Sequence, residues 1–386
     1  MNILYYTWNE ITYKDMYDTL LCMGHDVDSV CYKMSNYLVD RDFIELMEDK
    51  IDNGNYDCIF TVDYFPVISK ISLNKKIKYI SWVYDCPCWT VYSVMSHNPY
   101  NYIFHFDKLQ VERLRKMGVT NIYHMPLAVN TRRVLNQINN KTTDAHYIND
   151  ISFMGNLYND EHNFFDKIEG LSEYESGYID AIINSQLLFM GADIIDDSIS
   201  DVFLNGILEK VDINLDDELM VSQRDIILSM IRKKATVIER RQLIESLSDK
   251  FNVSLYSQSD SSFMKKVSAR GYIDYYEDMS KMFNRSKINL NITLRSILSG
   301  ISLRALDIMG AGGFLLSNYQ PELAELFEDG KEFVMYYSRQ DLMDKAAYYL
   351  EHDEERELIS RNGQKKIIEQ YDYSLVWEKI FNIVNN

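Results

Sequence analysis

The chain has 386 residues, of which 46% are hydrophobic, and its 58 acidic against 40 basic side chains give a formal net charge of −18. Such an acidic balance excludes a broad surface for nucleic acid or anionic lipid. Because no run of 18 apolar residues occurs in the sequence, we expect a cytoplasmic protein without a transmembrane segment. The length suits two domains, since single hydrophobic cores stop growing at ~250–300 residues.

The five cysteines all lie within the first quarter of the chain. They show neither the paired spacing of a zinc site nor the pattern of a disulfide framework. Cys86 and Cys88 flank a proline, and we interpret them as incidental thiols in a rigid loop. The sequence therefore predicts reduced cysteines and no metal centre.

Residues 1–130 alternate short apolar runs with helical patterns. We predict strands at residues 3–6, 27–32, 58–62, 79–84, 102–106 and 122–125, and helices at 13–23, 40–51 and 108–117. Strands that alternate with helices are typical of a parallel, doubly wound sheet. The N-terminal part is therefore predicted to be a Rossmann-like α/β domain.

Three of these predicted strands end in an aspartate, at Asp63, Asp85 and Asp107. Ligands of doubly wound sheets bind outside the carboxyl ends of the strands, so these side chains are expected at the working edge. Asp107 is predicted to cap the helix that follows it. Asp63 and Asp85 precede Pro66 and Pro87, which are expected to keep these two carboxylates on loops.

Residues 131–149 are polar and form the predicted linker to a second domain. A new strand follows at 150–158, in which Gly155 lets a ligand approach the backbone. Residues 171–249 have a helical period without strand signals. We predict that they are a helical insertion in this second Rossmann-like domain, which spans 150–370.

Strand and helix patterns alternate again after the insertion. We predict strands at 253–256, 288–293, 314–317 and 333–337, a turn at Gly271–Tyr272, and helices beyond Arg339. The final segment, 371–386, carries Trp377 among apolar residues at helical spacing. We expect this segment to be a helix that docks onto another element.

Residues 300–325 have the features of a cradle for a nucleoside diphosphate. A helix entrance at Gly300 offers backbone N–H groups and the positive end of the helix dipole to a phosphate. Arg304 and Asp307 stand three residues apart and share a helix face, which suits phosphate oxygens and a ribose diol. The alternative is an ordinary Arg–Asp ion pair within the helix, on a solvated face.

The order and spacing of five segments resemble GT-B glycosyltransferases, and most closely the CgeB-like group named for a spore-maturation protein. These segments are residues 79–87, 102–107, 125–130, 150–158 and 303–323. The resemblance covers nearly the whole chain and implies two facing Rossmann-like domains, with the last helix crossing back to the first. It also implies that the N-terminal domain holds an acceptor and the C-terminal domain a nucleoside-diphosphate sugar, the donor.

The same resemblance assigns roles to residues of the second domain. Asp307 would hold the ribose, and Arg304 would stabilise charge on the departing diphosphate. The remaining candidate contacts are Gly271 and Tyr272 for the base, and Gly155, Asn156 and the backbone at Gly300 for the diphosphate.

One position departs from the family pattern. Many retaining GT-B enzymes carry two glutamates separated by seven residues, and the place of the first, counted back from Asp307, is Ser299. The retaining mechanism is therefore not implied. An inverting transfer needs a general base near the acceptor hydroxyl. Asp85, then Asp63, then Glu10 are the candidates, and each has loop ordering as its alternative role.

We expect transfer of a hexosyl or deoxyhexosyl group from a nucleoside-diphosphate sugar to a hydroxyl of a glycan, a protein or a small molecule. No cofactor or metal is expected, because Arg304 and the helix dipole supply the positive charge. Two alternatives remain: a non-catalytic protein that binds sugar nucleotides or glycans, and a sugar-nucleotide epimerase. The insertion at 171–249 is the expected place for acceptor selection or for homodimer contacts.

Overall fold

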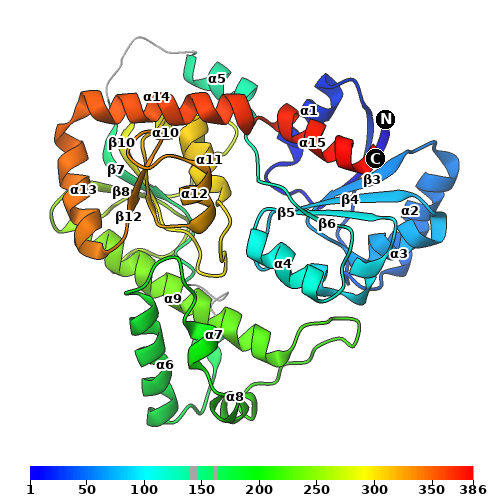
Figure 1. Ribbon diagram of the computed structural model, residues 1–386, viewed down its shortest axis with the longest axis horizontal. Helices are drawn as coiled ribbons and strands as arrows, with labels where there is room; N and C mark the ends of the chain where they lie inside the picture. Colours follow the sequence, from blue (N-terminus) through cyan, green and yellow to red (C-terminus); the bar gives the residue numbers. More distant parts are fainter. Residues whose placement is uncertain (140–146, 160–163, 386) are drawn as a thin grey trace. The chain divides into compact units, whose positions relative to one another are not determined.

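The computed structural model describes residues 1–139, 147–159 and 164–385, which form two compact units. The first unit consists of Met1–Asn130, Leu215–Ser222 and Asp372–Asn386, and the second of Thr131–Asn214 and Gln223–Tyr371. Each unit contains one parallel β-sheet flanked by helices (Figure 1). The predicted α/β class with two Rossmann-like sheets is confirmed.

The first sheet has six parallel strands in the order β2-β1-β3-β4-β5-β6. They are β1 (Asn2–Thr7), β2 (Asp26–Cys31), β3 (Cys58–Val62), β4 (Lys78–Val83), β5 (Asn101–His105) and β6 (Ile122–His124). Successive side chains of a strand point to opposite faces. Leu4 and Tyr6 of β1 therefore join one hydrophobic cluster, and Ile3 and Tyr5 join another. Burial on both faces explains why these strands are apolar runs in the sequence.

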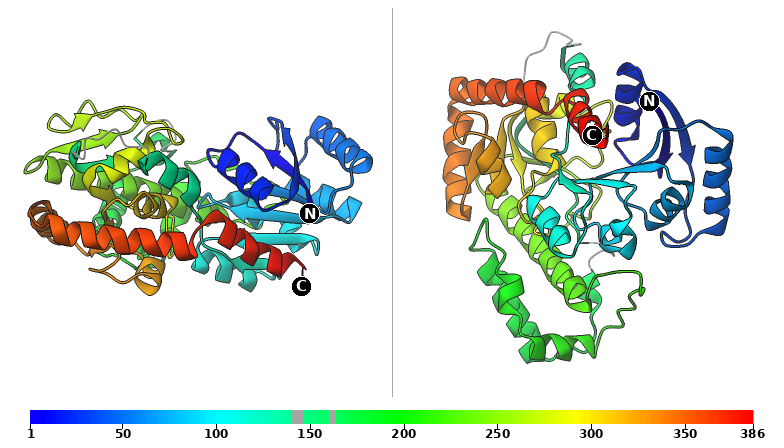
Figure 2. Two further views of the ribbon diagram at one scale, coloured as in Figure 1. Left: turned by 90° about the horizontal axis from the view of Figure 1, so that it is seen from above. Right: turned by 45° about the vertical axis from the view of Figure 1, so that its right-hand side comes forward.

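Helices cover both faces of this sheet. One face carries α2 (Arg41–Asn53), α3 (Pro66–Lys75) and α4 (Lys108–Lys116), and the other carries α1 (Tyr13–Cys22) and the last helix, α15 (Tyr373–Asn385). Trp377 of α15 packs edge-on against Phe60 and Trp82, with ring centroids 4.7 and 5.6 Å apart. Figure 2 shows α15, in red, running alongside this sheet. The apolar face of α15 thus completes the core of the first unit.

The second sheet also has six parallel strands, in the order β12-β11-β10-β7-β8-β9. They are β7 (Asn149–Met154), β8 (Val253–Tyr256), β9 (Ser268–Ala269), β10 (Ser286–Asn291), β11 (Leu315–Asn318) and β12 (Val334–Tyr336). The strand order reverses between β7 and β10, which makes this pair the topological switch point. The helices of this unit outside the insertion are α5 (Thr131–Asn139), α10 (Met279–Asn284), α11 (Leu303–Gly310), α12 (Pro321–Leu326), α13 (Arg339–Glu351) and α14 (Asp353–Gln370).

A helical insertion separates β7 from β8 (Figure 1, green). It contains the short 3-10 helix η3 (Phe164–Lys167) and the helices α6 (Glu173–Gln186), α7 (Ile195–Ser198), α8 (Asp201–Leu208) and α9 (Gln223–Ser248). These α-helices bury a hydrophobic cluster of their own, which includes Ile182, Ile207 and Ile231. The C-terminal half of α9 contributes Leu243 and Ile244 to the core of the sheet. The insertion is therefore continuous with the second sheet.

Residues 215–222 interrupt the insertion and pack in the first unit. The backbone N–H of Val94 donates to the carbonyl of Glu218 at 2.8 Å, and that of Met220 donates to the carbonyl of Tyr92 at 2.6 Å. Only helix was expected here from the sequence. Two backbone hydrogen bonds require no alternation of apolar and polar residues, so the sequence did not predict that this segment packs in the first unit.

One other segment differs from the predictions, and one agrees with them. Residues 131–139, predicted as part of a polar linker, form the helix α5, because Val134 and Ile138 recur at helical spacing and are buried. Residues 140–146 of that linker lie outside the described residues. Asp63 lies on the loop between β3 and α3, as predicted, and Pro66 takes the first helical position of α3, which tolerates proline well. None of the helices in the described ranges is long and apolar enough to cross a membrane.

Candidate functional site

Three carboxyl groups meet at one edge of the first sheet. Glu10, Asp63 and Asp85 follow β1, β3 and β4 within three residues, and these strands are neighbours. The carboxyl ends of parallel strands share one edge, where doubly wound sheets bind ligands. We call these three residues the acid edge. The sequence predicted their position after strands, and the strand order brings them together.

Asp63 holds the loop that carries Asp85. Its Oδ1 accepts the backbone N–H groups of Tyr84, at 2.8 Å, and of Asp85, at 2.9 Å. Asp63 is buried and has a positive φ of 62°, a left-handed conformation that is uncommon for residues other than glycine. Strained residues of this kind concentrate at functional sites. The geometry gives Asp63 a positioning role beside Asp85.

The acid edge favours protonated carboxyl groups. Burial and the nearby charge of Asp85 raise the pKa of Asp63 to about 8, although two backbone N–H groups oppose the shift. Burial also raises the pKa of Asp85, whose side chain still reaches solvent. Two carboxyl groups this close disfavour a double negative charge. Asp85 is therefore the accessible member of a pair with unusual proton affinity, as a general base requires.

Glu10 has its hydrogen bonds inside the protein. Tyr5 donates its hydroxyl to Oε1 at 2.5 Å, while the Thr7 hydroxyl and the Trp8 backbone N–H donate to Oε2 at 2.8 and 3.1 Å. Burial raises the pKa of Glu10, and these donors oppose the shift. With three donors around its carboxylate, Glu10 is placed to order the loop that follows β1. Glu10 is thus the weakest of the three candidates for a base.

Asp63→Asn is expected to stabilise the protein at alkaline pH. The folded-state pKa of Asp63, about 8, lies above its ordinary value of 3.8, so folding becomes less favourable as the pH rises from about 4 to about 8. The asparagine keeps an oxygen for the two N–H groups and removes this loss. We expect a gain of ~1–3 kcal/mol in unfolding free energy at pH 8 that vanishes near pH 4. Urea denaturation at both pH values measures it.

Asp40→Asn is the control with the opposite sign. Hydrogen bonds from Ser35 and from the backbone of Phe43 lower the pKa of Asp40, so this carboxylate stabilises the fold above its pKa and loses that contribution on acidification. Asp40→Asn should therefore be less stable than the parent at pH 8 and equal to it at low pH. An Asp63→Asn variant that behaves like Asp40→Asn would contradict the raised pKa.

Asp107 has the capping role predicted for it. Its Oδ1 accepts the backbone N–H groups of Leu109 and Gln110, at 3.0 and 3.2 Å, at the start of α4. These bonds satisfy donors that the first turn of a helix leaves open. The prediction that Asp107 caps α4 is confirmed, and Asp107 does not join the acid edge as a candidate base.

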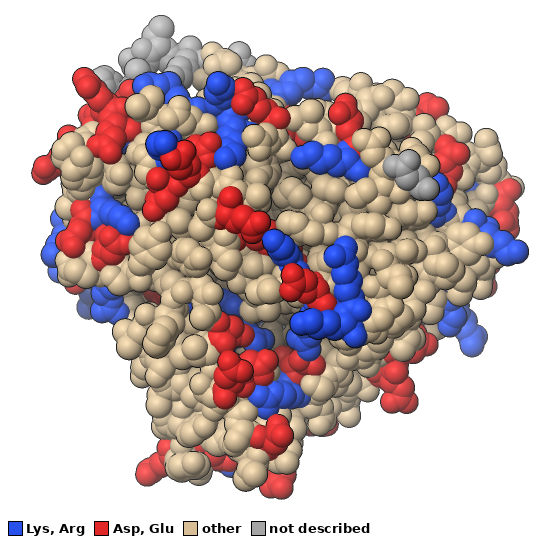
Figure 3. Space-filling view, viewed as in Figure 1, with Lys and Arg blue, Asp and Glu red and all other residues tan. Residues whose placement is uncertain are grey.

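The entrance of α11 lies at the carboxyl edge of the second sheet. The helix begins at Leu303, with Ser302 in the N-cap position. The Ser302 hydroxyl makes no cap hydrogen bond and instead lies 3.4 Å from Oδ1 of Asn291, the last residue of β10. On the face shown in Figure 3, Lys and Arg side chains are interspersed with Asp and Glu. The net charge of the whole chain is −18, so a phosphate would depend on local groups such as this entrance.

Arg304 and Asp307 form the ion pair that was the alternative reading of this helix. Nη1 of Arg304 lies 3.3 Å from Oδ2 of Asp307. The pair is not on a solvated face, because Asp307 is only 2% exposed and Arg304 packs against Met279 and the ring of Phe283 in α10. Removing one partner of a buried ion pair costs more folding free energy than removing one partner of a surface pair. Both residues remain candidates for donor binding.

The other predicted donor contacts lie in loops of the same unit. Gly155 and Asn156 follow β7, and the Asn156 side chain accepts the Ser259 hydroxyl at 2.9 Å. Gly271 has a φ of 73° and open space where a side chain would stand. Tyr272 beside it is exposed. A flat ligand group can therefore approach the backbone at Gly271.

Arg240 of α9 is a candidate that was not predicted from the sequence. It is 8% exposed, and its Nη2 donates to the carbonyl of Ile292, after β10, at 2.7 Å. Its Nη1 donates to the carbonyl of Asn156, after β7. Arg240 thus bridges the two strands of the switch point. Its buried Nε has no hydrogen-bond partner within the described part of the chain, and burial lowers its pKa, although an arginine stays charged.

Comparison with known proteins identifies the fold. Residues 233–382 match the family described as Glycosyl transferase-like. A sucrose-phosphate synthase from Thermosynechococcus elongatus has a TM-score of 0.57 and 8% identity, covering 100% of this chain and 98% of that one. WaaG, a glycosyltransferase involved in lipopolysaccharide biosynthesis, has a TM-score of 0.55 and 10% identity, with 100% of both chains covered. The fold is GT-B.

A sequence relative matches only part of the chain. An uncharacterized protein of Aquifex aeolicus is 22% identical over 155 residues, which are 39% of this chain and 38% of that relative. Residues 233–382, matched by the family, contain β8 to β12 and α10 to α14. Within this GT-B chain, the family match therefore lies mainly on the second unit and includes α11 and Arg240.

The position that lacks the family glutamate has a carboxylate beside it. The Ser299 hydroxyl donates to Oε1 of Glu322 at 2.7 Å, and the backbone N–H of Glu322 donates to the carbonyl of Ser299 at 3.1 Å. Glu322 is buried in the first turn of α12. In this GT-B protein an acid thus reaches the place of residue 299 from another element. Among the described residues, no group of three or more His, Cys, Asp or Glu side chains is placed to hold a metal ion.

Proposed function

We propose that this protein is a glycosyltransferase that moves a hexosyl or deoxyhexosyl group from a nucleoside-diphosphate sugar to an acceptor hydroxyl. The observation that carries the proposal is the buried guanidinium of Arg240 at the β7–β10 switch point, where sheets of this kind bind ligands. The match of residues 233–382 to the Glycosyl transferase-like family supports the same reaction. The segments at 79–87 and 303–323 favour the CgeB-like group within the GT-B fold.

The donor is proposed to bind at the carboxyl edge of the second sheet. Arg240 and the entrance of α11 at Gly300 offer positive charge and N–H groups to the diphosphate, close to the loop of Gly155 and Asn156. Asp307 accepts the ribose hydroxyls. The base rests at the open backbone of Gly271 and Tyr272.

The transfer itself is proposed to use the acid edge. Asp85 takes the proton of the acceptor hydroxyl, the hydroxyl oxygen forms a bond to the anomeric carbon, and the bond from that carbon to the diphosphate breaks. The electron pair leaves with the nucleoside diphosphate, whose growing charge Arg240 and Arg304 stabilise. Asp63 positions the Asp85 loop through its two backbone hydrogen bonds. With two arginines in this role, the reaction needs no metal.

A two-step experiment tests this function. A thermal-shift screen with UDP, GDP and dTDP should show one diphosphate that raises the melting temperature by binding the folded state. Sugars linked to that diphosphate are then incubated with acceptor candidates, and release of the free diphosphate is measured. Binding without release would favour a binding protein, and an isomerised sugar nucleotide would favour an epimerase. Either result would overturn the proposal of sugar transfer.

Asp307→Ala is expected to weaken binding of the identified diphosphate by ~1.5–3 kcal/mol, the range for a hydrogen bond to a charged group. The carboxylate is 2% exposed and lies 3.3 Å from Nη1 of Arg304. Isothermal titration calorimetry measures the change. A 2′,3′-dideoxy nucleotide should bind the parent and the variant alike, because it lacks the hydroxyls that Asp307 would accept.

Asp278→Ala is the matched control. Asp278 and Lys281 form an ion pair with the same three-residue spacing at 3.4 Å, but both side chains are solvent-exposed. This variant should bind the diphosphate like the parent protein. If Asp307→Ala also leaves the affinity unchanged, Asp307 is only the partner of Arg304 and does not belong to the donor site.

A further inference from the structure

A recess opens at the carboxyl edge of the second sheet, and the insertion forms one of its walls. It is lined by residues 186–195 of the insertion, by residues 295–298 after β10, and by residues 318–320 at the end of β11. Its space, including the open mouth, is about 390 Å³, and about 30 Å³ of it is open to the centres of water-sized groups. One water needs ~10–15 Å³ by that measure, so the narrow part has room for about two such groups.

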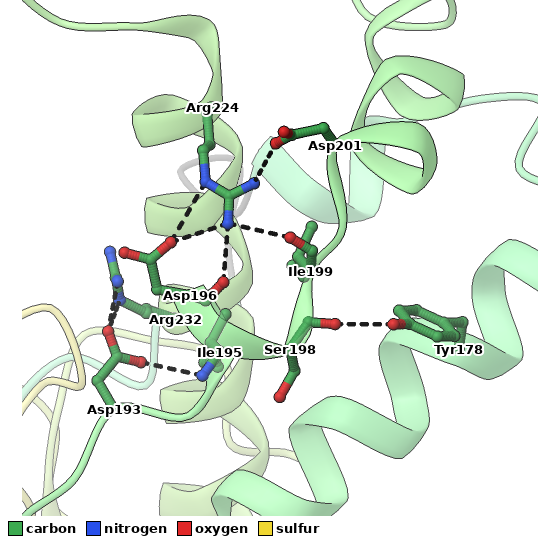
Figure 4. Close-up of polar contacts among 9 residues, drawn as sticks. All are labelled: Tyr178, Asp193, Ile195, Asp196, Ser198, Ile199, Asp201, Arg224 and Arg232. Carbon is green, nitrogen blue, oxygen red and sulfur yellow. Dashed lines mark hydrogen bonds and ion pairs between the residues drawn. The ribbon is translucent and has the colours of Figure 1, made fainter.

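Contacts on two sides fix the position of the insertion wall, residues 186–195. Gly191 has a φ of 76°, and a methyl group there would come within 2.2 Å of the Tyr319 ring. Arg232 of α9 donates to Asp193 at 2.8 Å, and Arg224 contacts Asp196 at 3.0 Å and Asp201 at 3.2 Å (Figure 4). The loop between α6 and α7 is therefore held against α9 on one side and against the end of β11 on the other.

The charges in the recess are already paired. Arg295 donates to Glu239 through Nε at 2.9 Å and through Nη2 at 2.5 Å, and both side chains are largely buried. Asp193 is paired with Arg232. A ligand group that enters the recess therefore gains little from carrying a charge. The lining suits a neutral group that both donates and accepts hydrogen bonds, such as a hydroxyl.

The Gln320 amide is a polar group of the recess without a partner in the described part of the protein. Gln320 lines the recess and is 7% exposed, yet its amide makes no hydrogen bond to any residue in the described ranges. The Gln320 amide atoms are not among the buried polar atoms that lack a partner, so they reach the solvent of the recess, where polar groups bond water or a ligand. The Gln320 amide offers both a donor and an acceptor. A ligand hydroxyl in the recess can therefore bond to it in either direction.

A chain of polar contacts connects this recess with the entrance of α11. The Ser302 hydroxyl lies 3.4 Å from Asn291. Asn291 donates to Thr293 at 3.1 Å, and the backbone N–H of Thr293 donates to Oδ1 of Asn318 in the wall of the recess at 2.9 Å. The recess and the proposed diphosphate site therefore share the carboxyl ends of β10 and β11, a few residues apart.

We propose that this recess receives the exocyclic hydroxymethyl arm of the donor sugar, and that the insertion thereby selects hexoses over pentoses. The proposal rests on the proposed function, since it assumes a sugar attached to the bound diphosphate. Gln320 hydrogen-bonds the hydroxyl of that arm, and Gly191 keeps the insertion wall close enough to enclose it. The insertion is then a determinant of donor specificity.

Glucose and xylose donors test this assignment, because xylose lacks only the hydroxymethyl arm. Both are compared as conjugates of whichever of UDP, dTDP or GDP stabilises the protein, by calorimetry with the full chain. The parent should bind the glucose conjugate at least threefold more tightly than the xylose conjugate. Gln320→Ala should lower that preference by about three- to tenfold while leaving the affinity for the diphosphate alone unchanged.

Two further variants complete the test. Gly191→Ala, on the insertion, should also reduce the preference, because its methyl group displaces the wall from Tyr319. Gln340→Ala, an exposed glutamine of α13, should keep it. Equal binding of both conjugates by the parent, or an unchanged preference in Gln320→Ala and Gly191→Ala, would overturn the recess assignment while the diphosphate still binds. Absence of any diphosphate binding would instead overturn the proposed function, and this inference with it.

Discussion

Asp85→Asn is expected to lower kcat by ~10²–10⁴, the usual contribution of a positioned general base. The amide cannot take the proton of the acceptor hydroxyl. Affinity for the nucleoside diphosphate should stay the same, because Asp85 belongs to the first unit and the proposed donor contacts belong to the second. Initial rates with the identified donor and acceptor, together with calorimetry of the diphosphate, measure both quantities.

The pH profile gives this prediction a second readout. A base works when deprotonated, so the raised pKa of Asp85 should place the acidic limb of kcat/KM at higher pH than an ordinary aspartate would. That limb should be missing in Asp85→Asn. Asp57→Asn is the control, since Asp57 directly precedes β3 and lies at the amino end of that strand. If Asp63→Asn abolishes activity and Asp85→Asn retains it, the base is Asp63.

Much of the fold was predictable because parallel strands are buried on both faces. The runs at 58–62 and 79–84 are continuous and apolar, and β3 and β4 lie within one residue of them. The predicted strand at 288–293 likewise matches β10 to within two residues at each end. Short elements were less visible: β9 has two residues, and both are exposed, so hydrophobic burial left no trace of it in the sequence.

The candidate sites were predictable only in part. That acids follow strands is a local property, so Asp63 and Asp85 were found from the sequence. That Asp63 holds the backbone of Asp85 depends on the order of β3 and β4 in the sheet, and the sequence does not encode that order locally. Arg240 was missed for a similar reason, because in a 26-residue helix it looks like any other surface cation.

Glu322 illustrates the same limit at the position of Ser299. The motif of two glutamates is recognised by its spacing along one segment. Because Ser299 occupies the first position, the sequence indicated that a carboxylate was lacking there. In the structure the loop before α11 lies against the first turn of α12, and Glu322 brings its carboxylate to Ser299. Contacts between two turns that are 23 residues apart depend on packing, which spacing does not reveal.

Arg240→Gln is expected to lower kcat/KM for the donor by ~10²–10³, the loss seen when one positioned donor to a developing negative charge is removed. The affinity for the nucleoside diphosphate should fall with it, whereas the affinity for the nucleoside alone should not change. Arg240→Lys keeps the charge but replaces the planar guanidinium, whose two terminal nitrogens donate to Asn156 and Ile292, with a single ammonium, so we expect it to restore only part of the activity.

Arg241→Gln separates this role from a general loss of charge on α9. Arg241 is the next residue, but its side chain is exposed and pairs with Glu245 at 3.3 Å. This variant should keep the parent kcat/KM. A purely structural Arg240 would lower the melting temperature and weaken nucleoside and diphosphate binding by the same factor. A selective loss for the diphosphate instead requires that the guanidinium meets phosphate, because the nucleoside carries no charge for it to recognise.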